Sequence, residues 1–275
     1  MVEVLGYDIG GANTKAALMH TENGKVLGVD VAVEYFPIWK EPEKLTSVLT
    51  ALKERLNARK LDAVGVTMTA ELSDAYRTKR EGVHQILSCV EKAFPNLPIF
   101  VLNTAAELFS PECAEKDPLS VAAANWIATG WLVAQHLKNA LVVDVGSTST
   151  SIIPIVNGQV AAKGKTDLDK LICGELVYTG SLRTNVAAIV QSISLKNGAA
   201  RVSSELFAQS GDVHLLLGNI TEADYTSETA DGRAKNIPEA LARLSRVVCA
   251  DNEMLTKHHC YNISFMNFSY SSIFH

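Results

Sequence analysis

Two stretches of the chain consist of β-prone apolar runs that glycine turns interrupt at matching places. The segment "DIGGANTKAA" at 8–17 aligns with "DVGSTSTSII" at 144–153, and downstream "NGKVLG" at 23–28 aligns with "NGQVAA" at 157–162. Asn-Gly between two β-prone runs favours a hairpin turn, because both residues accept a positive φ angle. Each stretch therefore predicts a three-stranded antiparallel meander, and the repeat predicts two similar halves.

Between and after the meanders, helix and strand patterns follow one another. An apolar stripe at helical spacing, formed by Leu45, Val48, Leu49, Leu52 and Leu56, predicts a helix over 41–60. Further helices are expected over 82–94, over 117–137 with Asp117 as its cap, near 183–195 and near 238–250, and buried strands over 61–69 and 97–103. Such alternation predicts an α/β fold.

The internal repeat sets the expected domain organisation. We expect a first domain over 1–139, a second over 140–257 and an atypical tail over 258–275. The tail contains no Asp, Glu, Lys or Arg and is rich in Phe, Ser, Asn, Tyr and His, unlike the chain before it. It is interpreted as an out-of-frame or chimeric ending, with a real edge strand or tail as the alternative.

Composition limits the classes of function. Of the 275 residues, 47% are apolar and 20% are charged, which is a globular balance, and the formal net charge is -5. No nucleic-acid partner is expected, since phosphate backbones need a clustered positive surface. Five scattered cysteines without a CxxC pair, no signal-peptide pattern and no apolar run of roughly 20 residues indicate a soluble cytoplasmic protein that crosses no membrane. Association as a homodimer is left open.

The glycine turns carry the candidate chemistry. A turn without bulky side chains exposes successive backbone N–H groups, which form a nest for an anion. In the first turn, Asp8 is placed to hold Mg²⁺ through water, and Lys15 and the Thr14 hydroxyl are placed to contact phosphate oxygens. The expected phosphate-binding residues are Gly10, Gly11, Asn13 and Thr14 with Gly146, Ser147 and Thr148 of the second turn, where Asp144 is a second metal ligand. One such turn would be read as an ordinary hairpin, but two copies facing each other across a cleft could hold a polyphosphate from both sides.

The paired turns resemble the phosphate loops of the actin/hexokinase/Hsp70 ATPase superfamily. That resemblance implies an α/β fold of two RNase H-like (actin-like ATPase) domains around a central cleft. Further motifs, among them "VTMTAELSDAY", "AAANWIATGW" and "GKTDLDKLICGELVYTGSLRTNV", resemble the hydantoinase/oxoprolinase-like group linked to tetrahydromethanopterin C1 transfer. The resemblance covers residues 1 to about 256.

For function, the resemblance implies a transferase of methanofuran biosynthesis. It would join an aminomethylfuran-methyl diphosphate to the phenol of γ-glutamyltyramine and release pyrophosphate, with Mg²⁺ as the expected cofactor. Two alternatives stay open: an ATP-dependent small-molecule kinase or hydantoinase/oxoprolinase-type hydrolase, and a non-catalytic nucleotide-binding regulator. ATP is not favoured, because no glycine turn suited to adenosine stands out after residue 232.

The implied reaction needs a base, since an unperturbed phenol has a pKa of about 10. Glu71, just past a predicted strand, is the first candidate and Asp8 the second. From residue chemistry alone, Glu71 is equally well explained as a carboxylate that satisfies free N–H groups at the start of a helix. The resemblance favours the catalytic role, and Lys15 and Asp8 are the other expected catalytic residues. The expected substrate-binding residues are Asp167, Asp169, Glu175, Tyr178, Arg183 and Thr184. Arg183 suits bidentate binding of a carboxylate or phosphate, and its alternative is pairing with Glu175 in a solvated loop.

Overall fold

The computed structural model describes residues 1–195 and 198–255 of the chain. The atypical tail predicted at 258–275 therefore lies outside the described residues. Within the described ranges, no helix is both long enough and apolar enough to cross a membrane.

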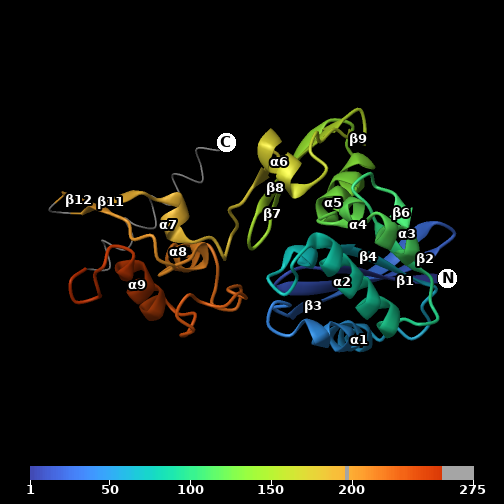
Figure 1. Ribbon diagram of the computed structural model, residues 1–275, viewed down its shortest axis with the longest axis horizontal. Coiled ribbons are helices and arrows are strands. Elements are labelled where there is room, and N and C mark those ends of the chain that lie inside the picture. The colour runs from blue at the N-terminus through green and yellow to red at the C-terminus, as the bar shows by residue number, and fades with distance from the viewer. Residues whose placement is uncertain (196–197, 256–275) are drawn as a thin grey trace. The chain divides into compact units, whose positions relative to one another are not determined.

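The chain divides into two compact units, which Figure 1 colours in sequence order. The first contains residues 1–144 and 151–176, and the second contains residues 145–150 and the described residues from 177 onward. The turn 145–150 is thus grouped with the second unit although the strands that it connects belong mainly to the first.

The first unit is built on a six-stranded sheet with the strand order β3-β2-β1-β4-β5-β6. Its strands are β1 (Val2–Ile9), β2 (Asn13–Glu22), β3 (Lys25–Tyr35), β4 (Ala63–Met68), β5 (Ile99–Leu102) and β6 (Leu108–Phe109). The first three strands form the predicted antiparallel meander, whereas β4 runs parallel to β1 and β5 runs parallel to β4. The α/β prediction is confirmed, and the carboxyl ends of β1 and β4 lie side by side.

Two helices cover one face of this sheet (Figure 1). They are α1 (Leu45–Arg55), which follows the short η1 (Pro42–Lys44), and α2 (Lys79–Ala93), which follows η2 (Ala70–Leu72). Leu5, Tyr7 and Ile9 alternate along β1 and share a buried cluster with Leu49 of α1 and Ile86 of α2. The Tyr7 hydroxyl donates to the Leu49 carbonyl oxygen at 2.7 Å, so this buried polar group is satisfied. The apolar stripe predicted over 41–60 is therefore the core side of α1.

A second sheet follows, with the strand order β10-β8-β7 and with β9 paired to β8. Its strands are β7 (Ala140–Val145), β8 (Thr150–Val156), β9 (Gln159–Val160) and β10 (Leu176–Val177), and the chain around it also forms α5 (Asn125–Ala134) and α6 (Asp167–Cys173). The preceding helices α3 (Pro111–Lys116) and α4 (Pro118–Val121) belong to the core of the first sheet, through Ala114 and Val121. Trp126 and Ile127 of α5 share a buried cluster with Ile153 and Ile155 of β8. Helix α5 and this sheet therefore form a second core within the first unit.

Both predicted Asn-Gly turns are confirmed. Asn23 has a φ angle of 50° and Asn157 one of 53°, and the glycine after each has a φ angle of 76°. These paired positive angles are those of a hairpin turn that continues the right-handed twist of the strands. The turns close the β2–β3 and β8–β9 hairpins at equivalent places of the repeat.

The long helix predicted over 117–137 is wrong. It is divided into α4 and α5, because Ala123 between them has a left-handed φ angle of 51° that no helix continues through. Asp117 does precede α4, but its side chain makes no capping hydrogen bond.

The helix predicted near 183–195 is also wrong in extent. Only α7 (Val186–Ile189) forms there, and the backbone at Val190 is already extended, with φ -114° and ψ 130°. Strand β11 (Ser192–Leu195) follows at once and pairs with β12 (Gly198–Arg201). The helix predicted near 238–250 is confirmed as α9 (Ile237–Arg246).

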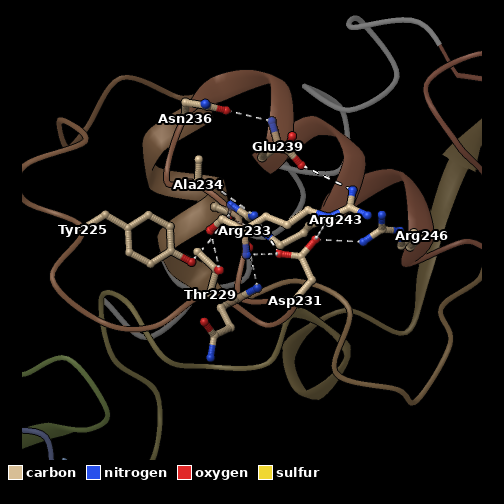
Figure 2. A network of polar contacts seen from close by, with 11 residues as sticks. Tyr225, Thr229, Asp231, Arg233, Ala234, Asn236, Glu239, Arg243 and Arg246 are labelled. Atoms are coloured by element: carbon tan, nitrogen blue, oxygen red, sulfur yellow. Dashed lines mark hydrogen bonds and ion pairs between the residues drawn. The ribbon is translucent and has the colours of Figure 1, made fainter.

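A buried network of ion pairs holds the second unit together (Figure 2). Arg243 of α9 donates to Asp212 of α8 (Ser210–Leu216) through Nε at 2.9 Å and Nη2 at 2.7 Å, and both side chains are fully buried. Nη1 of Arg243 donates to Asp231 at 3.1 Å, and Arg246 pairs with the same carboxylate at 3.0 Å. The Tyr225 hydroxyl donates to Asp212 at 3.2 Å. The network joins α8, α9 and the loop before α9.

Replacing Arg243 with Met should destabilise the second unit strongly, because it leaves the Asp212 carboxylate buried without its cation. Breaking a buried pair from one side costs about 3–5 kcal/mol. The matched control is Arg246→Met, which removes a partly exposed partner of Asp231 and should cost about 1 kcal/mol or less. Urea unfolding followed by circular dichroism measures both variants, and equal losses would contradict the prediction.

Candidate functional site

The two glycine turns are closed by the same backbone hydrogen bond. Gly10 donates its N–H to the carbonyl oxygen of Asn13 at 3.0 Å, and Gly146 donates to that of Ser149 at 2.9 Å. The internal repeat read from the sequence is therefore present in the hydrogen bonding. The first turn belongs to the first unit and the second turn to the second unit, so their convergence on one ligand stays a prediction.

Several backbone N–H groups of both turns are unengaged. Within residues 1–195 and 198–255, the N–H groups of Gly11 and Ala12 donate to no acceptor, and neither do those of Ser147 and Thr148. The carbonyl oxygens of the first turn are used instead, since they accept from the segment 36–38. Successive free N–H groups in a turn are the donors that an anion nest requires.

Three polar side chains emerge beside the first turn on the sheet face opposite α1 and α2. Asp8 at the end of β1 is paired in register with Lys15 on β2 and Thr67 on β4. Lys15 donates to Asp8 Oδ2 at 3.1 Å, whereas Asp8 Oδ1 and the Thr67 hydroxyl are buried without a hydrogen-bond partner among the described residues. The three residues line a concavity of about 490 Å³ whose floor includes Gly6 and Ala17.

Thr14 lies on the other face of the same sheet. It is paired in register with Ile9, is 0% exposed, and its hydroxyl has no hydrogen-bond partner within the described part of the chain. Since neighbouring residues of a strand point to opposite faces, the Thr14 hydroxyl is directed away from Lys15. Its predicted contact with phosphate stays a prediction.

Asp8 and Asp144 were predicted as metal ligands. Asp144 accepts a hydrogen bond from Thr129 at 3.3 Å. Among the described residues, no group of three or more His, Cys, Asp or Glu side chains could hold a metal ion unaided. Mg²⁺ is commonly bound by one or two carboxylates, water and substrate phosphates, and the unpaired oxygens of Asp8 and Thr67 fit that mode.

A buried ionic cluster lies next to the first turn. Thr69 donates its N–H to the carbonyl oxygen of Ile9 at 2.9 Å, which fixes the start of η2 against the end of β1. Glu71, two residues further on, is 1% exposed. Lys79 Nζ lies 3.4 Å from Glu71 Oε1 and 3.1 Å from Asp167 Oδ2. Lys79 therefore bridges two carboxylates, and its partner Asp167 is 88 positions away in the sequence.

The local sequence explains how Lys79 reaches this place. Thr78 caps α2 by accepting the N–H of Glu81 at 3.1 Å, so Lys79 is the first residue of the helix. Gly82 lets this first turn pack against η2, because a Cβ at that position would overlap the backbone of Glu71. The helix start and the buried carboxylate are thus held in direct contact.

The cluster shifts the proton affinity of its members. Burial raises the pKa of Glu71, and the charge of Lys79 offsets part of that rise. Burial alone would lower the pKa of Lys79, but the charges of Glu71 and Asp167 together raise it above its ordinary value. Lys79 is therefore a fixed cation, and Glu71 is a carboxyl group with the increased proton affinity that suits a general base.

A fully buried lysine, Lys170, follows Asp167 on α6. Lys170 is 0% exposed, and its Nζ lies 3.8 Å from the centroid of the Trp126 ring and 3.3 Å from Ser151 Oγ. Burial lowers the pKa of Lys170 to about 8, against the opposing charges of nearby carboxylates. Within the first unit, Lys79 and Asp167 therefore connect Glu71 with α6. On that helix, Lys170 interacts with the charge of Asp167 and contacts the Trp126 ring.

Sequence reasoning missed Lys79 and Lys170 as site residues. Lys79 could have been found, because it stands one turn before Val83 and so begins the stripe of α2 that becomes buried in the core. A lysine at the start of such a stripe indicates a buried charge that needs a partner. Lys170 gives no comparable signal, since α6 is only seven residues long.

Two predicted substrate-binding carboxylates are occupied by backbone groups of the first unit. Asp169 forms a capping box with Thr166 at the start of α6. Glu175 accepts the N–H of Lys163 at 2.8 and 3.0 Å and that of Gly164 at 2.8 Å. These contacts favour structural roles for both residues, and binding of substrate by them stays a prediction.

The other predicted substrate-binding residues surround the second turn in the second unit. Arg183 donates its backbone N–H to the carbonyl oxygen of Ser147 at 2.9 Å, and its Nη1 donates to the Thr148 hydroxyl at 3.4 Å. Thr184 is buried beside it, whereas Tyr178 is exposed. The structure thus brings Arg183 and Thr184 to the second turn, and Asp167 to the ionic cluster of the first unit.

Fold and turns together define an α/β protein with a candidate site for a phosphate-bearing small molecule. Residues 62–269 match the hydantoinase/oxoprolinase family, and the chain belongs to that family. It is 43% identical over 255 residues to "(4-{4-[2-(gamma-L-glutamylamino)ethyl]phenoxymethyl}furan-2-yl)methanamine synthase" of Methanocaldococcus jannaschii. The aligned region covers 92% of this chain and 74% of that protein. A protein of the same name from Methanococcus vannielii is 44% identical over 133 residues, or 48% of this chain and 60% of that protein.

Among solved structures, the nucleotide-free form of acetone carboxylase is similar in fold. The TM-score is 0.54 with 10% sequence identity, and the match covers 96% of this chain and 60% of that chain. At such low identity the likeness concerns the fold alone.

Lys15→Ala should weaken the binding of pyrophosphate with Mg²⁺ about tenfold or more, since a hydrogen bond to a charged group contributes about 1.5–3 kcal/mol. The matched control is Lys25→Ala, which removes an exposed lysine from the β2–β3 hairpin of the same sheet and should leave the affinity unchanged. Isothermal titration calorimetry measures both variants. The same affinity for both would remove Lys15 from the phosphate site.

Proposed function

We propose that this protein is a transferase of methanofuran biosynthesis that joins an aminomethylfuran-methyl diphosphate to γ-glutamyltyramine and releases pyrophosphate. The observation that carries the proposal is the 43% identity, over 92% of the chain, to a synthase whose name describes the resulting phenoxymethylfuran. The bond that defines this product is the ether between the phenol oxygen and the furan methylene carbon. The candidate site contains groups suited to making that bond.

In the reaction, the phenol oxygen forms a bond to the methylene carbon while the bond from that carbon to the diphosphate oxygen breaks. The diphosphate leaves with the electron pair, and the phenol proton passes to a base. A furanylmethyl carbon tolerates positive charge in the transition state. The protein therefore mainly has to position both substrates, stabilise the leaving group and exclude water.

The first turn is assigned to the leaving group. The free N–H groups of Gly11 and Ala12 donate to the diphosphate oxygens, and Lys15 at the edge of the turn adds a cation. Asp8 and Thr67 are the groups that would hold Mg²⁺, which supplies further neutralisation of the departing charge when it is bound. Each of these interactions grows stronger as charge develops on the diphosphate.

Glu71 is assigned as the base that takes the phenol proton. Its burial and its raised pKa increase its proton affinity, and Lys79 holds it in place. Asp8, the second candidate, is paired with Lys15 and is better placed to hold a cation. The assignment therefore separates a proton-accepting carboxylate from a charge-neutralising one.

The proposal includes two RNase H-like domains around a central cleft, in which the second turn approaches the diphosphate from the other side. Two observations support this arrangement. Each turn is closed by an equivalent backbone hydrogen bond of its own, and the fold is similar to that of acetone carboxylase. Ser147, Thr148 and Arg183 would then complete the phosphate contacts. The ligand, with its metal ion, would draw the two turns together.

Purified protein supplied with the furan diphosphate, γ-glutamyltyramine and Mg²⁺ should release one pyrophosphate for each ether product formed. Pyrophosphate is measured with a coupled enzyme assay, and the ether by mass spectrometry. Omission of the phenol is the control and should abolish the ether. Hydrolysis of ATP without any ether formation would contradict the proposal and favour a kinase or hydrolase.

Lys79→Met should move the acidic limb of the pH–rate profile to higher pH. Glu71 must be ionised to accept a proton, and Lys79 lowers its pKa, so loss of that charge raises the pKa further. Lys92→Met, at an exposed position of the same helix, is the control and should leave the profile unchanged.

Glu71→Gln should lower turnover most at mildly acidic pH, where an unaided phenol is least ionised. A shift to lower pH in Lys79→Met, or a pH-independent loss in Glu71→Gln, would contradict the assignment of Glu71 as base.

A further inference from the structure

A second cavity of the first unit plays no part in the chemistry above. Its volume is about 440 Å³, within the usual range for small-molecule sites. Trp126 and Trp131 of α5 line its apolar side. Its polar side chains are those of Thr104, Gln135 just after α5, Gln159 of β9, and Lys165.

The wall of this cavity carries one positive charge, on the exposed residue Lys165. Lys165 is its only charged lining residue, and the Lys165 side chain makes no hydrogen bond or ion pair within the described part of the chain. The backbone just before it is fixed, because the Glu175 carboxylate accepts the N–H groups of Lys163 and Gly164. A free ammonium beside two amides and two indoles suits a ligand that carries a carboxylate, an amide and an apolar or aromatic chain.

Trp126 connects this cavity with the ionic cluster. Lys170 lies over its ring at 3.8 Å, yet Lys170 does not line the cavity. The indole therefore separates the cavity from the side where Lys170, Asp167 and Lys79 lead toward Glu71. The indole N–H is buried without a hydrogen-bond partner among the described residues, so a donor is still unused in this wall.

The backbone beside the cavity is held in unusual conformations. Ala106, which lines the cavity, has a φ angle of 62°, and Ala123, just before α5, has one of 51°. Non-glycine residues rarely adopt positive φ angles, and such strain tends to gather at ligand sites. This agrees with a cavity shaped for a ligand.

We propose that this cavity binds the γ-glutamyl amide end of the phenol substrate, with its carboxylate on Lys165 and its hydrocarbon chain against Trp126 and Trp131. This inference rests on the proposed function and adds a specificity site to it. A substrate held in this way keeps its amino-acid end in the cavity and leaves its phenol outside the cavity for the reaction. The cavity would therefore select phenols by the group at their far end.

The test compares kcat/KM for γ-glutamyltyramine with kcat/KM for tyramine, which lacks the γ-glutamyl group, at saturating furan diphosphate. Lys165→Met should lower the ratio of the two values about tenfold, through a higher KM for γ-glutamyltyramine. Lys165→Arg should restore most of the ratio because it restores the positive charge. The matched control is Lys25→Met, which removes an exposed lysine outside both cavities and should keep the wild-type ratio.

A binding measurement separates this inference from the reaction itself. γ-Glutamyltyramine alone should quench the indole fluorescence of the wild-type protein, and both Lys165→Met and Trp131→Ala should require about tenfold more of it. Normal turnover with an unchanged substrate ratio in Lys165→Met would overturn the assignment of the cavity and leave the reaction intact. Absence of pyrophosphate release by the wild type with either phenol would reject the reaction, and the quenching would then decide the cavity by itself.

Discussion

The ion bridge made by Lys79 is the interaction on which the geometry of the candidate site depends. One of its carboxylates, Glu71, follows the central strand β4, and the other, Asp167, begins α6 between β9 and β10 of the second sheet. Glu71 is buried, whereas Lys79 and Asp167 are only partly buried. A buried carboxylate is unfavourable without a partner, so loss of Lys79 would leave the Glu71 charge uncompensated. The bridge therefore fixes η2, α2 and α6 together within the first unit. It also keeps a carboxyl group of raised pKa close to the first glycine turn.

The glycine turns contribute in a different way, through backbone rather than side chains. The bond from Gly10 to Asn13 closes the turn, and the carbonyl oxygens beside it are used by the segment 36–38, which leaves N–H groups as the unsatisfied backbone donors. Such donors need no reorganisation to meet a phosphate. Side-chain charge is added at the edge by Lys15, which is itself held by Asp8. Because the anion would be bound mainly by backbone N–H groups, a short glycine motif is sufficient to suggest anion binding. A glycine turn has no side chain that can accept a proton, so the base has to come from elsewhere in the fold.

Local patterns predicted the parts of the fold that depend on local physics. The meanders, the Asn-Gly turns and α1 follow from side-chain period and from residues that accept positive φ angles. The break between α4 and α5 could not be predicted, because alanine favours helix and only the surrounding packing holds Ala123 at a φ angle of 51°. In the candidate site, the turns and Glu71 were predicted from motifs, whereas the pairing of Lys79 with Asp167 joins positions 88 residues apart and leaves no local pattern in the sequence. Glu175 shows the reverse case, since a carboxylate that was predicted to bind substrate accepts hydrogen bonds from the backbone of 163–164.

Net charge adds a constraint on how a diphosphate could be bound. The chain carries a formal charge of -5, so its overall field does not attract a polyanion. In the proposal, binding is therefore local and short-range, and it would use the free N–H groups, Lys15 and a cation held by Asp8. The proposed phenol substrate faces no such barrier, and the cavity at Lys165 would offer its carboxylate a single cation in an otherwise uncharged wall. The two substrates would thus be recognised in different ways. The diphosphate would be bound by clustered charges, whose interaction with it strengthens as negative charge develops on the leaving group. The phenol substrate would be bound by the shape of the cavity and a single ion pair, and these contacts stay the same during the reaction.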